Sequence, residues 1–99
     1  MRWLTKLKMV TLFLRGVTAM RTKEAICRRI QELCLENNLT VNGLSTRCGM
    51  TQSTINNIVS GRNNSATIAT VKKICDGLEM ELPEFFNSDL FRNLEQEIY

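Results

Sequence analysis

The sequence contains no histidine, and this absence narrows the chemistry that the chain can perform. A cysteine nucleophile would lack the histidine base that usually activates it, and histidine is also a common zinc ligand. No two of the four cysteines have CxxC spacing, and no glycine-rich phosphate loop is present. We therefore expect no enzyme activity, no metal site, no cofactor and no small-molecule ligand.

The four cysteines, Cys27, Cys34, Cys48 and Cys75, all fall at apolar positions of predicted helices. A reduced cysteine in such a position behaves as a small buried hydrophobe. This pattern is typical of a reduced, cytoplasmic protein. A redox-sensing thiol is the alternative, although no basic or helix-start setting distinguishes any one of the four.

Proline occurs once and glycine five times, so long structureless segments are not expected. Residues with strong strand preference are scattered rather than alternating, and we predict no strand. A hydrophobic content of 43% permits a core, and 6% aromatic residues suit a small helical bundle. The sequence therefore predicts an all-α protein with one small domain at residues 20–86, an extension at 1–19 and a tail at 87–99.

Charge is distributed unevenly along the chain, although the net charge is only +3. Residues 1–19 contain four bases and no acid, and residues 20–75 contain eight bases and three acids. Residues 76–99 contain one base and seven acids. This asymmetry suits a domain that faces phosphates while its tail points elsewhere, and ordinary solvated helix faces are the alternative.

The apolar run in the extension at 1–19 is too short for a signal peptide or a membrane-spanning segment. The stretch Met9 to Leu14 has six residues before Arg15, whereas a signal core needs about 7 to 15 and a span about 20. An interfacial amphipathic helix, with Trp3 and Leu7 opposite Lys6, is an alternative. We expect a disordered or loosely packed arm and no membrane association.

Residues 39–61 carry the pattern around which the rest of the chain is organised. A threonine N-cap precedes each of two predicted short helices, Val41–Cys48 and Gln52–Ser60. Gly49 between them supplies a left-handed residue, and Gly61 ends the second helix. The second helix has an uncharged polar outer face, whose amides and hydroxyls suit base edges in a major groove: Ser53, Thr54, Asn56 and Asn57.

Helices are also predicted on both sides of this pattern. The first should begin with Thr22 as its N-cap, end at Asn37-Asn38 and place Arg28 and Arg29 on its outer side. A later helix, capped by Ser65 or Thr67, should stop at Gly77 and bury an inner stripe: Ile68, Val71, Ile74, Cys75 and Leu78. A short turn of helix follows at 81–86.

The tail after residue 87 has apolar residues at helical spacing, which favours an amphipathic helix. These residues are Leu90, Phe91, Leu94 and Ile98. Such a helix could make a subunit contact or fold back on its own domain, and the sequence leaves both open.

Residues 22–86 resemble the helix-turn-helix domain of the lambda-repressor-like (Cro/Xre) family. The spaced residues that carry the resemblance are Leu39-Thr40, Leu44, Gly49, Thr51, Ile55, Gly61 and the ending Leu82-Pro83-Glu84-Phe85-Phe86. The chain departs from the family where a glutamine often stands, which here is Val41. It also has Cys34 and Val59 where the family often pairs an arginine with a glutamate. The resemblance implies a five-helix bundle, with room for an extra C-terminal helix.

The resemblance also implies a function. The protein would be a transcriptional regulator, specifically a repressor. As a homodimer it would bind double-stranded DNA, with the helix Gln52–Ser60 in the major groove. Base contacts are then expected from Gln52, Ser53 and Asn57. Contacts to the DNA backbone or to flanking bases are expected from Thr40, Asn42, Thr51, Thr54, Asn56, Arg62, Asn63, Asn64 and Ser65. The alternative is a protein-interaction module on the same fold, such as an antitoxin or a regulatory partner.

Overall fold

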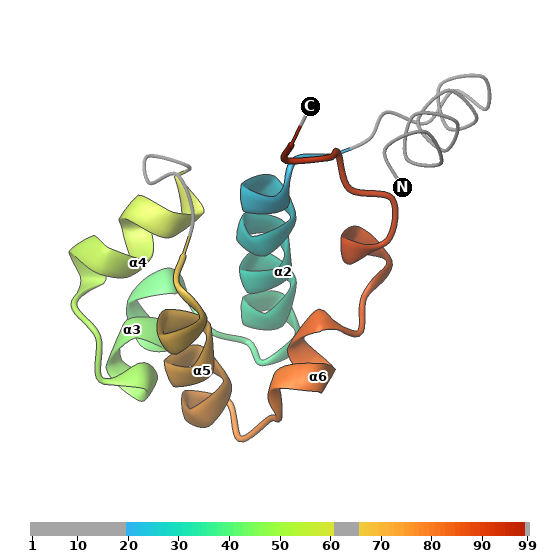
Figure 1. Cartoon of the computed structure of the whole chain (residues 1–99). Helices are drawn as coiled ribbons and strands as arrows, with labels where there is room; N and C mark the ends of the chain where they lie inside the picture. The colour runs from blue at the N-terminus through green and yellow to red at the C-terminus, as the bar shows by residue number, and fades with distance from the viewer. Residues whose placement is uncertain (1–19, 61–65, 99) are drawn as a thin grey trace.

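The computed structural model describes residues 20–60 and 66–98 of the chain (Figure 1). This part consists of helices, in the order α2 (Thr22–Glu36), α3 (Val41–Cys48), α4 (Gln52–Val59), α5 (Ile68–Gly77), α6 (Leu82–Phe86) and the 3₁₀ turn η1 (Asp89–Phe91). Across residues 20–60 and 66–98 there is no strand, and the one β-type pairing is a parallel bridge between Met20 and Leu94. The predicted all-α class is confirmed.

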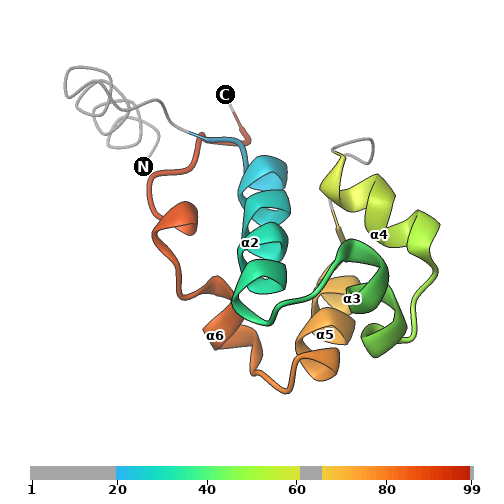
Figure 2. The ribbon, with the colours of Figure 1, turned by 180° about the vertical axis from the view of Figure 1, so that it is seen from behind.

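The long helix α2 stands at the centre of the molecule. Helices α3, α4 and α5 lie on one side of it, whereas α6 and the tail lie on the other side (Figures 1 and 2). Helix α3 packs against both α4 and α5, and α2 packs against α4, α3 and η1. One core joins these elements, and its largest fully buried side chains are Phe85, Ile30, Leu44, Ile55, Ile74, Val71 and Cys75.

The start of the first helix differs from its prediction. Its N-cap is Arg21, which makes no side-chain cap bond, so Thr22 is the first helical residue rather than the cap. Its end is as predicted, because Asn37 is the C-cap and Asn38 has a positive φ of 54°. Asn tolerates this left-handed conformation, which turns the chain toward α3.

Arg29 was expected on the outer side of α2, and this prediction is wrong. Its side chain is buried, with 9% of the residue exposed. The guanidinium donates hydrogen bonds to the carbonyl oxygens of Phe85 (2.7 Å) and Glu84 (3.0 Å), and it pairs with Glu32 at 2.9 Å. The Glu84 carbonyl oxygen also accepts from the Asn87 amide at 3.2 Å. The planar guanidinium reaches the last carbonyls of the short helix α6 and so fixes it against α2.

Helix α5 begins with Thr67 as its cap and ends at Gly77, as predicted, but the prediction for Ile68 is wrong. The sequence places Ile68 on the inner stripe, but this residue is 64% exposed, whereas Val71, Ile74 and Cys75 of the same stripe are buried. Gly77 is the last helical residue, and the left-handed residue beyond it is Glu79, with φ 56°.

Gly77 is instead required where α5 meets α3. A Cβ at this position would lie 2.6 Å from Cys48 Sγ, 3.0 Å from Cys48 Cα and 3.1 Å from the Arg47 carbonyl oxygen. Only the distance to Cys48 Sγ is below 3.0 Å, where atoms clash, but the two backbone atoms are also unusually close and cannot rotate away as a side chain can. The absence of a side chain therefore sets how closely the two helices approach.

The tail does not form the helix that its apolar spacing favours. After the single turn η1, Asn93 has a positive φ of 79°, and residues 94–95 pair with Met20, which precedes α2. The Glu95 amide donates to the Met20 carbonyl at 2.9 Å. Phe91 packs against the rings of Phe86 and Phe85, with centroid distances of 4.9 and 6.0 Å. The tail thus folds back on its own domain.

Candidate nucleic-acid interface

The turn between α3 and α4 has the geometry that the sequence predicts. Thr40 caps α3 by accepting a hydrogen bond from the Gly43 amide at 3.0 Å, and Thr51 caps α4 by accepting from Thr54 at 3.2 Å. Between them, Gly49 adopts φ 64°. Helix α4 ends at Val59 with Ser60 as its C-cap, one residue earlier than predicted, and Gly61 lies outside the described residues.

Helix α4 has one buried and one exposed face. Ile55 and Ile58 are buried in the core. The residues predicted to read bases lie away from these two side chains: Gln52 and Ser53 are exposed, and Asn57 is half-buried. Thr54 and Asn56 are also exposed. The structure thus brings five uncharged polar side chains together on one short helix, fixed at its start by a capped turn.

The residues expected to contact the DNA backbone are only partly within the described part of the chain. Thr40, Asn42 and Thr51 are exposed at or near the starts of α3 and α4. The hydroxyls of Thr51 and Thr54 are 2.7 Å apart, so each orients the other. The remaining predicted residues, Arg62, Asn63, Asn64 and Ser65, lie outside the described residues.

The starts of α3, α4 and α5 share a chemical property that those of the other helices lack. Each is capped by a threonine hydroxyl, and none has an acidic residue in its first turn. By contrast, α2, α6 and η1 each carry an acid there: Glu24, Glu84 and Asp89. A helix start has a partial positive charge and unpaired amides. Three starts without a competing carboxylate are therefore suited to an external anion.

Two of the four cysteines, Cys34 and Cys75, are buried in the core. Burial raises the pKa of the Cys34, Cys48 and Cys75 thiols, which keeps them protonated at neutral pH. None of the four cysteines is in a disulfide. The Cys27 thiol donates to the Ile58 carbonyl oxygen at 2.6 Å and so links α2 to α4. Among residues 20–60 and 66–98, no cluster of metal-ligating side chains is found.

One ion pair on α5 lies outside the candidate interface. The Lys72 ammonium donates a hydrogen bond to the Asp76 carboxylate, and this bond raises the pKa of Lys72. Over the residues that the structure describes, no helix is long and apolar enough to cross a membrane.

Comparison with known proteins identifies the family. A family model described as helix-turn-helix (HTH_3) matches residues 30–85. The crystal structure of protein 11 of prophage Lp1 is similar to this chain, with 31% identity and a TM-score of 0.67 over 76% of this chain and 99% of that one.

A second similar structure is an HTH_3 family transcriptional regulator from Vibrio cholerae. It has 29% identity and a TM-score of 0.62, and the match covers 69% of this chain and 38% of that one. No curated protein matches the sequence. Because the family model spans more than half of the chain and the folds agree, the chain belongs to the HTH_3 helix-turn-helix family.

Proposed function

We propose that this protein is a sequence-specific regulator of transcription that binds double-stranded DNA with α4 in the major groove. The observation that carries the proposal is the exposed polar face of α4, held by the capped α3–α4 turn. Gln52, Ser53 and Asn57 contact base edges, since the amides of Gln and Asn can bond adenine bidentately. A similar structure is that of a transcriptional regulator, which supports the same role here.

The DNA backbone is held by groups around the base-reading residues. The starts of α3, α4 and α5 direct amides at phosphates. Side-chain contacts come from Thr40, Asn42, Thr51, Thr54 and Asn56, together with Arg62, Asn63, Asn64 and Ser65. The DNA-binding domain in this proposal spans residues 20–86, with 1–19 as an extension.

The protein acts as a homodimer and represses transcription. Helix α4 has no lysine or arginine, so one copy makes few charge-based phosphate contacts and binds weakly. Two copies related by a two-fold axis would read half-sites about 34 Å apart and combine their affinities. A dimer that occupies such an operator in the cytoplasm blocks the polymerase; its role is binding rather than catalysis.

The test is selection of binding sequences from random double-stranded DNA, at two salt concentrations. Enrichment of a palindrome is expected. On the enriched site, Asn57→Ala should weaken binding by about 1–3 kcal/mol, because a bidentate base contact contributes roughly this much discrimination. Asn87→Ala, an equal truncation of an exposed asparagine on the α6 side, is the matched control and should bind as the wild type does.

The outcome against the proposal is a chain that shows neither enrichment nor salt-dependent binding. A protein-interaction module would then be favoured, because the acidic residues gather on α6 and the tail, on the side of α2 away from α4. Glu81, Glu84, Asp89, Glu95 and Glu97 are the side chains that a basic partner would meet.

A further inference from the structure

Basic side chains in the described part of the chain fall into two groups. Four are in ion pairs: Arg21 with Glu95, Arg29 with Glu32, Lys72 with Asp76 and Arg92 with Asp89. The other four have no ion pair within residues 20–60 and 66–98, and these are Lys23, Arg28, Arg47 and Lys73. Two of this second group, Lys23 and Arg28, line one groove.

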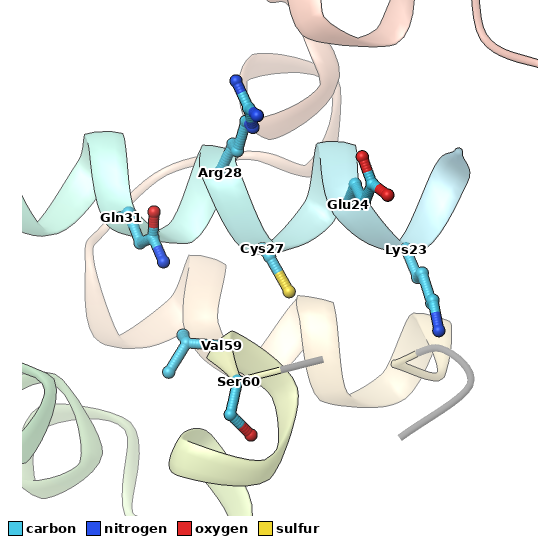
Figure 3. Close-up of a pocket in the computed structure, with 7 residues that line it drawn as sticks. All are labelled: Lys23, Glu24, Cys27, Arg28, Gln31, Val59 and Ser60. Carbon is cyan, nitrogen blue, oxygen red and sulfur yellow. The ribbon is translucent and has the colours of Figure 1, made fainter. Parts of the chain in front are cut away.

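The groove lies between the first half of α2 and the C-terminal end of α4 (Figure 3). It has a volume of about 250 Å³ and is lined by Lys23, Glu24, Cys27, Arg28, Gln31, Val59 and Ser60. Lys23, Cys27 and Gln31 follow one another at intervals of four residues, so they form one row along α2. In Figure 3, Lys23 and Cys27 point toward the α4 side, whereas Arg28 and Glu24 point away from it.

The walls of the groove are held together by a specific contact. The Cys27 thiol, in the middle of the row, donates to the Ile58 carbonyl oxygen in the last turn of α4. The position of Lys23 relative to Ser60 is therefore fixed by packing rather than by the reach of a flexible side chain alone. Glu24 and Arg28 carry opposite charges four residues apart, so they offset one another and leave Lys23 as the net charge.

The groove continues the exposed polar face of α4. Ser53, Asn57 and Ser60 are spaced by four and three residues, which places them on one ridge of the helix. About 10 Å of helix axis separates Ser53 from Ser60, at 1.5 Å per residue. The major groove of B-DNA is about 12 Å wide. When the start of α4 contacts bases, its end therefore lies beside the flanking sugar–phosphate strand.

We propose that this groove holds one phosphate of that flanking DNA strand. The Lys23 ammonium supplies the charge, and the Gln31 amide and the Ser60 hydroxyl donate hydrogen bonds. In the structure the Ser60 hydroxyl donates to the Asn57 carbonyl oxygen at a distance of 3.4 Å, which is long for a hydrogen bond. Little free energy is therefore lost when this hydroxyl rotates toward the phosphate. The proposal rests on the DNA-binding function proposed above and supplies a cation that α4 itself lacks.

The test compares Lys23→Gln with Arg92→Gln in the full-length chain. Both changes remove one positive charge, but Arg92 lies on the tail and is paired with Asp89. The dissociation constant is measured against salt concentration on the selected site and on a random duplex. Each lost phosphate contact should reduce the slope of log K against log salt by about 0.9, which corresponds to roughly eightfold weaker binding per copy at 0.1 M salt, so a dimer that loses one contact in each copy should lose about 1.8 in slope. Lys23→Gln should show this loss equally on both duplexes, and Arg92→Gln should not.

Two further variants distinguish the loss of a phosphate contact from the loss of the folded state. Lys23→Arg should restore the salt dependence of the wild type. Gln31→Glu adds an anion to the groove and should weaken binding to both duplexes at least as much as Lys23→Gln. Equal thermal melting of all the variants shows that they are folded. If the wild type binds with salt dependence but Lys23→Gln keeps its slope, this proposal is wrong while the DNA-binding function stands. If the wild type shows no salt-dependent binding, both fail.

Discussion

Arg29 is a charged side chain whose role is to join two helices that are far apart in the sequence. Its guanidinium contacts the carbonyls of Glu84 and Phe85, 55 and 56 positions away. A helical pattern indicates which face a residue occupies on its own helix, but not which carbonyl groups a later segment will bring to it. Arg28 and Arg29 therefore look alike in the sequence, although the first is exposed and the second is buried.

Replacing Arg29 by methionine should destabilise the fold by about 2–3 kcal/mol. The change leaves two backbone acceptors without their charged donor, and a lost hydrogen bond to a charged group usually costs this much. In thermal unfolding this corresponds to a fall of roughly 10 °C or more for a domain of this size. Arg28→Met, an exposed neighbour, should change the free energy of unfolding by less than about 0.5 kcal/mol. Equal melting temperatures for the two variants would show that the α6 contact is not stabilising.

At the scale of elements, the contact between α3 and α5 depends on one missing side chain. Gly77 has Cys48 Sγ, Cys48 Cα and the Arg47 carbonyl within the space that a methyl group would need. Helix α3 also holds α4 in place, since the two are joined by the Gly49 turn and pack together. A displacement of α3 from α5 would therefore reach the residues of α4 that we propose to read bases.

Gly77→Ala should destabilise the protein by about 1–3 kcal/mol, as is usual for overpacking a filled core. This loss occurs even though alanine is the better helix former by about 1 kcal/mol. Gly43→Ala in α3 is the matched control, because its Cβ would have contacts no closer than 3.4 Å. The control variant should keep or raise the free energy of unfolding, whereas Gly77→Ala should lower it. Urea unfolding of both variants measures these changes. A gain in stability for both variants would contradict the close approach of α3 and α5.

The elements that the sequence predicts well are those determined by local signals. Thr40, Gly49 and Thr51 set the bounds of α3 and α4 through caps and a left-handed residue, which need no distant partner. The helix expected in the tail depended on apolar spacing alone. There, packing of Phe91 on Phe86 and pairing of Glu95 with Met20 override that spacing. The residues proposed to read bases follow from the local motif, whereas the groove with Lys23 requires the packing of α2 on α4.

At the scale of the whole molecule, three helices contribute thiols to one core. Cys34 from α2, Cys48 from α3 and Cys75 from α5 each have a pKa raised by burial. In the unfolded chain these thiols ionise near pH 8.5. The folded state keeps them protonated to higher pH, so their contribution is fully present below about pH 8.5 and is lost as the pH rises through the folded values.

We therefore expect the free energy of unfolding to fall as the pH rises above about 8.5. The pKa of Lys72 is also raised, by its hydrogen bond to Asp76, and acts in the same direction, but this exposed pair contributes little. Cys75→Ala removes one buried thiol and should reduce the alkaline loss, although its stability at pH 7 will be lower. Midpoints of urea unfolding, measured at several pH values from neutral upward, test this dependence of stability on pH. A parallel fall for wild type and variant would assign the loss to other groups.

The pairing of Glu95 with Met20 joins the two ends of the described domain. Closing a loop of about 75 residues costs roughly 4 kcal/mol of chain entropy before any constant term. A single backbone bridge cannot offset this cost alone, so it forms only after the core has brought the two segments together. We expect the tail to dock last in folding and to detach first in unfolding, while the α3–α4 unit, whose contacts are local in sequence, assembles early.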